Sequence, residues 1–184
     1  MFSALLQDAL GLSALDATWV YQVPTSGGGV RSLSLDGRIE MDHISDLAGR
    51  RRVEVWLDRV KADLLLHPEL ASRIKGAVFE VRQGYKSKDS KRQNADIANA
   101  SSAYANLYVP VLLLFSTQID EGVASRYAQA RWLLLSGTHS SDPTRSTFAF
   151  STAVLDYDLA AFFERNSERL KNELPSVLNT LLEA

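Results

Sequence analysis

Residues 77–82, Ala-Val-Phe-Glu-Val-Arg, are the clearest strand in the sequence. Apolar and charged side chains alternate toward its end, which places Glu80 and Arg82 on the same face. Residues 109–115, Val-Pro-Val-Leu-Leu-Leu-Phe, form an uninterrupted apolar run of the kind that is buried on both faces of a sheet. Between them, the polar, alanine-containing segment 90–106 predicts a helix. This order of strand, helix and strand predicts neighbouring parallel strands.

Strands and helices continue to alternate after residue 115. The patterns predict a helix over 120–130, a strand over 131–135, a polar loop over 138–145, a strand over 147–154 and a helix over 158–174. Such an alternation is typical of an α/β domain, so we expect a mixed central β-sheet that is flanked by helices.

The first part of the chain carries different signals. Apolar spacing predicts a short helix at the start, and the β-type runs 19–23 and 30–35, separated by Pro24 and a glycine turn, predict a hairpin. Segment 46–61 fits a helix, although Val53, Val55 and Leu57 also alternate as a strand would. Segment 62–66 predicts a short buried strand.

Length and composition limit the classes of protein that the chain can form. With 184 residues, 46% hydrophobic and 23% charged, the composition suits one soluble globular domain. We expect an N-terminal extension over 1–45, a core over 46–160 and a C-terminal helix over 161–184. The absence of cysteine excludes disulfides and thiol catalysis. No apolar run approaches the ~20 residues of a membrane span, and the start is a poor signal peptide, so we expect a cytoplasmic protein without a membrane partner.

The net charge of −2 hides an uneven distribution. Between residues 73 and 92, only Glu80 and Asp89 oppose seven cations, so this segment carries +5 and the rest of the chain −7. The seven cations are Arg73, Lys75, Arg82, Lys86, Lys88, Lys91 and Arg92. A basic segment that is followed by Gln93 and Asn94 suits phosphate contacts and hydrogen bonds to base edges.

Carboxylates lie near this segment in the sequence. Asp63 begins the predicted strand 62–66, Glu80 lies on the next strand, and Asp96 follows in the predicted helix. Two carboxylates on adjacent strands can hold a hard divalent cation through oxygen ligands. The glycine turn matches no phosphate-binding loop, so no nucleotide cofactor is expected. The three dispersed histidines are expected to be structural.

This arrangement resembles the PD-(D/E)XK nuclease superfamily, and residues 80–115 resemble the catalytic half of type II restriction endonucleases. The resemblance, which covers roughly residues 50–160, implies a restriction-endonuclease-like core and a homodimer that cleaves double-stranded DNA with Mg²⁺. It implies that Asp63 and Glu80 hold the metal with help from Asp96 or Glu54. It assigns Arg82 and Lys86 to catalysis. Lys86 is also assigned to DNA contact, with Lys88, Asp89, Lys91, Arg92, Gln93 and Asn94.

The sequence departs from the family pattern at two positions. Ala62 replaces the usual proline, which is a small change. Arg82 replaces the usual lysine, and an arginine stays protonated, so it can clamp a phosphate but is a poor proton acceptor. Lys86 is the residue that can supply the ammonium group instead. Asp96 is placed to replace or supplement Glu80.

Several alternatives stay open at this point. If residues 61–75 formed one helix, Asp58 would be the better first carboxylate. Glu80 and Arg82 can also be an ion pair on the sheet. The whole chain can be a DNA-binding or assembly subunit without catalysis, or a protein-interaction domain, and an RNA substrate is also compatible with the sequence.

Overall fold

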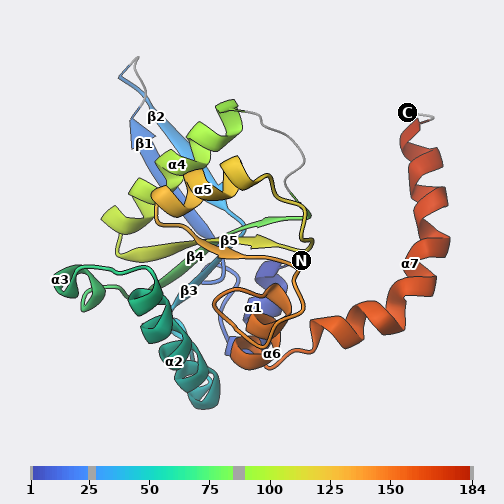
Figure 1. Cartoon of the computed structure of the whole chain (residues 1–184), viewed down its shortest axis with the longest axis horizontal. Coiled ribbons are helices and arrows are strands. Elements are labelled where there is room, and N and C mark those ends of the chain that lie inside the picture. The colour runs from blue at the N-terminus through green and yellow to red at the C-terminus, as the bar shows by residue number, and fades with distance from the viewer. Residues whose placement is uncertain (1, 25–27, 85–89, 183–184) are drawn as a thin grey trace.

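The computed structural model describes residues 2–24, 28–84 and 90–182, without the side chains of residues 24, 90–95, 97, 170 and 176–182. Figure 1 shows the arrangement of its elements. In chain order they are α1 (Phe2–Leu10), β1 (Trp19–Pro24), β2 (Val30–Leu35), β3 (Gly37–Glu40), the 3₁₀ turn η1 (Met41–His43), α2 (Leu47–Asp63), α3 (Pro68–Ala71), β4 (Gly76–Arg82), α4 (Ser90–Ala105), β5 (Tyr108–Leu114), α5 (Glu121–Gln129), β6 (Leu133–Leu135), α6 (Thr147–Leu155) and α7 (Leu159–Leu182).

A four-stranded sheet in the order β3-β4-β5-β6 forms the centre of the fold. Strand β3 is antiparallel to β4, whereas β4, β5 and β6 are mutually parallel neighbours. All seven residues of β5 are buried, as its continuous apolar sequence predicts. Helices cover both faces of the sheet (Figure 1). The predicted α/β fold with a mixed sheet is therefore confirmed, and β1 and β2 form the predicted hairpin beside it.

The two faces of β4 contact different sets of helices. Phe79 points to the face covered by α1, α2 and α6, where its ring lies 6.3 Å from that of Trp56 and 5.6 Å from that of Phe150. Val78 points to the other face, where it packs with residues of α4, α5 and the hairpin, including Tyr127. Because side chains alternate along a strand, Glu80 and Arg82 share the face of Val78.

Two predicted strands do not form, and the predictions for them were wrong. Helix α2 begins at the N-cap Asp46, whose carboxylate accepts a hydrogen bond from Gly49 N, and it continues to Asp63. The following residues form a turn in which Leu65 is exposed and has a φ of 49°, so segment 62–66 is not a buried strand.

Segment 147–155 is the second of these, and it forms α6. The Ser146 hydroxyl accepts a hydrogen bond from Ala149 N at 3.2 Å, which caps the first turn. Phe150, Val154 and Leu155 are buried, and this is a helical spacing. The cap and this packing outweigh the β-branched and aromatic residues that suggested a strand.

Helix α7 runs from α6 away from the rest of the molecule (Figure 1). Phe163 and Leu174 are exposed on it, Leu174 by 54%. Across the described residues, no helix combines the length and the apolar character that a membrane crossing requires.

Candidate active site at the carboxyl end of β4

Glu80 and Arg82 lie at the carboxyl end of β4, which is the side of a parallel sheet where α/β proteins bind their ligands. Arg82 Nη2 lies 2.9 Å from Glu80 Oε1. The ion pair that the sequence left open as an alternative is therefore present. Both side chains are largely covered, with 10% of Arg82 and 17% of Glu80 exposed.

Asp96 joins this pair from α4. Arg82 Nη2 donates to both of its carboxylate oxygens, at 3.1 Å to Oδ1 and 2.9 Å to Oδ2. Tyr127 of α5 donates its hydroxyl hydrogen to Asp96 Oδ2. The side chain of Asp96 is only 5% exposed. The structure thus brings together Glu80, Arg82 and Asp96, and it adds Tyr127, which was not predicted to be a site residue.

Asp63 is not part of this group. It is the last residue of α2 rather than the start of a strand, and its Oδ2 accepts a hydrogen bond from Thr144 Oγ1 at 2.8 Å. Val60, one turn earlier, packs in the same cluster as Phe79, on the face of the sheet opposite Glu80. The sheet therefore separates the carboxylates of Asp63 and Glu80.

The other two carboxylates of α2 are exposed and form ion pairs within the helix. Asp58 pairs with Lys61 at 3.0 Å, and Glu54 pairs with Arg51 at 2.6 Å. Since α2 covers the face of the sheet opposite Glu80, the structure does not bring Asp58 or Glu54 to Glu80 either.

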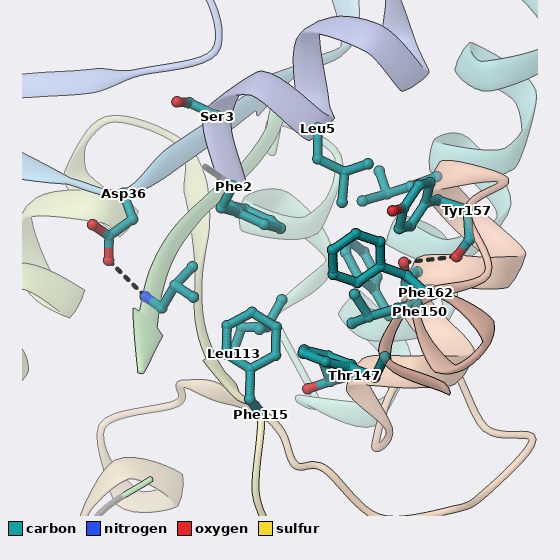
Figure 2. Close-up of a pocket in the computed structure, with 15 residues that line it drawn as sticks. Phe2, Ser3, Leu5, Asp36, Leu113, Phe115, Thr147, Phe150, Tyr157 and Phe162 are labelled. Carbon is teal, nitrogen blue, oxygen red and sulfur yellow. Dashed lines mark hydrogen bonds between the residues drawn. The ribbon is translucent and has the colours of Figure 1, made fainter. Parts of the chain in front are cut away.

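Asp36 is the carboxylate that the structure does bring to β4. The pairing of β3 with β4 sets Gly37 opposite Phe79, so continuing the register by one residue sets Asp36 opposite Glu80. Asp36 Oδ2 accepts a hydrogen bond from Val81 N at 2.8 Å, as Figure 2 shows. The residue is exposed. In the sequence, the only signal for it is an acidic residue that ends a β-type run.

A largely apolar pocket of about 610 Å³ adjoins Asp36 and Val81 on the face covered by α1 and α6 (Figure 2). Its walls include Phe2 from α1 and Phe115 beyond β5. The first turns of α7 contribute Leu159, Phe162 and Phe163, so the pocket lies at the point where α7 leaves the body.

The hairpin places Tyr21 close to the carboxylates on the opposite face. Its hydroxyl donates a hydrogen bond to Asn99 Oδ1 of α4. Burial raises the pKa of Tyr21 and is the largest effect, a hydrogen bond with Ser102 partly opposes it, and the negative charges of Asp96 and Glu80 add smaller increases. Strand β1 therefore covers part of the group formed by Glu80, Arg82 and Asp96.

The predicted DNA-contacting residues follow β4 directly in the chain. Lys86, Lys88 and Asp89 lie outside the described residues. Lys91, Arg92, Gln93 and Asn94 belong to the first turns of α4, and their side chains lie outside the description as well. Their roles remain predictions from the sequence.

In the part of the chain that the structure describes, no group of three or more histidine, aspartate or glutamate side chains is arranged to hold a metal ion. The acidic groups at the carboxyl end of β4 are Asp36 beside the strand and Glu80 on it, with Asp96 behind Arg82. Comparison of the chain with protein-family models, curated proteins and solved structures finds no match.

Proposed function

We propose that the protein is a metal-dependent DNA endonuclease of the restriction type, with a restriction-endonuclease-like core. The observation that carries this proposal is the register of β3 on β4, which, continued by one residue, sets the carboxylates of Asp36 and Glu80 opposite each other at the carboxyl end of β4. The basic segment 85–92 follows immediately in the chain. In this proposal Asp36 takes the role that the sequence analysis gave to Asp63.

The side chains present suit a hard divalent cation such as Mg²⁺, because carboxylate oxygens are its preferred protein ligands. Asp36 is exposed and Glu80 is partly exposed, so both are open to solvent. When bound there, Mg²⁺ supplies an activated water and stabilises charge on the phosphate. The backbone N–H of Val81 orients Asp36, and Arg82 orients Glu80. Arg82 stays protonated, so we assign it to charge stabilisation rather than to proton transfer.

A second candidate function is DNA binding without catalysis. Arg82 Nη2 contacts both Glu80 and Asp96 at 2.9 Å, so a permanent cation already neutralises these two carboxylates. A DNA-binding subunit that holds no metal ion would also contain carboxylates that are neutralised in this way.

Cleavage of plasmid DNA in Mg²⁺ or Mn²⁺ separates these two functions. The nuclease proposal expects discrete fragments and no cleavage after chelation with EDTA. Asp36→Asn and Glu80→Gln should each lower the rate by more than about 100-fold, which is beyond the usual effect of losing an outer partner of a metal ligand. Asp63→Asn is the matched control and should cleave at the wild-type rate, because α2 lies on the other face of the sheet.

Two results would contradict this proposal, the first its assignment of Asp36 and the second the nuclease function itself. One is an active Asp36→Asn variant beside an inactive Asp63→Asn variant, which would restore the original assignment of the first carboxylate. The other is salt-sensitive DNA binding with no cleavage in either metal, which would favour the second candidate.

We also propose that α7 packs against a second copy of this chain, because cleavage of both DNA strands requires two active sites. Leu174 is exposed, and the start of α7 lines the apolar pocket. Between residues 164 and 173 the helix carries three acidic and three basic side chains, so two copies would not repel each other.

Sedimentation velocity tests this proposal. The wild-type chain should sediment as a dimer, and Leu174→Glu should raise the dissociation constant at least about tenfold, equivalent to about 1.4 kcal/mol. Asn172→Glu is the matched control: it introduces the same charge on the same helix, but positions two residues apart do not share a face. A monomeric wild type, or a dimer that is insensitive to Leu174→Glu, would refute the assignment.

A further inference from the structure

We propose that Asp96 and Tyr127 are positioning residues that hold Arg82 at the active site, and that Asp96 is not a metal ligand. The inference deepens the proposed nuclease function and rests on it. It concerns four side chains from three elements: Glu80 and Arg82 from β4, Asp96 from α4 and Tyr127 from α5.

The four side chains form a chain of contacts from the interior to the surface. Tyr127 is fully buried, and 5% of the Asp96 side chain, 10% of the Arg82 side chain and 17% of the Glu80 side chain are exposed. Exposure therefore increases at each step from Tyr127 through Asp96 and Arg82 to Glu80. Glu80 is thus the most exposed of the four side chains, whereas Tyr127 and Asp96 are the most deeply buried.

The contacts of Asp96 indicate its role. Both carboxylate oxygens accept hydrogen bonds from Arg82 Nη2, at 3.1 and 2.9 Å, and Oδ2 also accepts one from Tyr127. Hydrogen bonds between ionised groups are short and strong. Both oxygens of Asp96 are thus engaged by protein donors, so we assign Asp96 to holding the guanidinium.

Tyr127 in turn holds Asp96. Its ring packs edge-on against Trp132 with a centroid distance of 5.6 Å, and both rings are buried. The phenol therefore has a fixed direction and fixes the carboxylate that it contacts. A guanidinium whose Nη2 is held by both Asp96 and Glu80 is already oriented when the substrate binds, and such preorganisation lowers the barrier of the chemical step.

This role accounts for arginine at a position where the resembling family has lysine. A guanidinium is a planar fork with five donors, and a single nitrogen of this fork, Arg82 Nη2, contacts both Glu80 and Asp96. An ammonium group is a compact point charge without this fork geometry. Arginine can thus connect the interior network with the carboxylate at the surface.

Single-turnover cleavage by Tyr127→Phe and Asp96→Asn tests the positioning role. Each change should lower the rate constant about 10- to 100-fold, as loss of an outer partner does. The dissociation constant for DNA and the Mg²⁺ concentration for half-maximal rate should stay at wild-type values. Tyr108→Phe is the matched control, since Tyr108 is nearly as buried as Tyr127 and its hydroxyl contacts Glu40 at 2.6 Å, far along β5 from Arg82. Its rate should equal that of the wild type.

A rate for Tyr127→Phe equal to that of Tyr108→Phe would overturn the proposal. So would a rise of more than about tenfold in the Mg²⁺ requirement of Asp96→Asn, because that is the signature of a lost ligand.

NMR spectra of the arginine side chains give a measurement that does not depend on cleavage. A held Arg82 should show separate Nη signals in the wild type, and these should merge in Asp96→Asn. Merged signals in the wild type would refute the inference. A wild-type chain that cleaves no DNA would instead overturn the proposed function, and the NMR comparison would then decide whether Asp96 holds Arg82.

Discussion

Arg82→Ala is expected to lower the free energy of unfolding by about 3–5 kcal/mol, the usual cost of removing one member of a buried ion pair. The substitution leaves the carboxylates of Glu80 and Asp96 close together without the cation that contacts both at 2.9 Å. Asp96 is almost fully covered, so water cannot replace the lost guanidinium without opening the packing between β4 and α4. Urea unfolding followed by circular dichroism measures the change.

Arg51→Ala provides the comparison for this prediction. Arg51 also forms a close ion pair, at 2.6 Å to Glu54, but both side chains are exposed on α2. Exposed pairs contribute at most about 1 kcal/mol, so this variant should unfold close to the wild-type midpoint. Equal losses for the two variants would mean that burial of the Arg82 network adds nothing to its stability.

Gly76→Ala is expected to cost at least about 3 kcal/mol, the upper end of the range for overpacking. A Cβ at residue 76 would lie 1.9 Å from the carbonyl oxygen of Ile39 and 2.9 Å from its carbonyl carbon. These are backbone atoms of β3, so they cannot move aside as a side chain would. The strand itself must shift away from β4, and with it the register that sets Asp36 opposite Glu80.

Two measurements test this prediction. Urea unfolding should show the loss of stability, and DNA cleavage should fall even at temperatures where the variant is folded, since Asp36 would be displaced. Gly122→Ala is the control, because its Cβ would meet only the Asp120 carboxylate at 3.1 Å. Its stability should change by less than about 1 kcal/mol. A Gly76→Ala variant of wild-type stability would contradict the tight approach of β3 to β4.

The sequence predicted the parallel half of the sheet because its signals are local. The run in β5 is apolar throughout and is buried throughout, and α4 and α5 lie where their patterns indicated. The wrong predictions concern short apolar segments, whose secondary structure depends on the residues that surround them. Residues 147–154 carry β-type side chains, yet the Ser146 cap and the burial of Phe150 and Val154 make them helical.

The candidate site was predicted only in part, because local sequence patterns do not reveal contacts between distant segments. Glu80, Arg82 and Asp96 were predicted, since one strand and the next helix bring them together. Asp63 was placed on a strand but ends α2, because no local signal marked that this helix continues beyond residue 61. Asp36 was missed because its position opposite Glu80 depends on the pairing of β3 with β4, and α2 and α3 lie between these strands in the chain.

That same pairing has a consequence for the order in which the chain folds. During synthesis β3 leaves the ribosome roughly 40 residues before the end of β4, a delay of roughly 2–8 s at ~5–20 residues per second. For that time the edge of β3 that pairs with β4 has no partner strand, and α2 is the only long helix made in the interval. The proposed active site therefore forms only after a long loop has closed, and a translational pause before residue 76 would lengthen the exposure of β3.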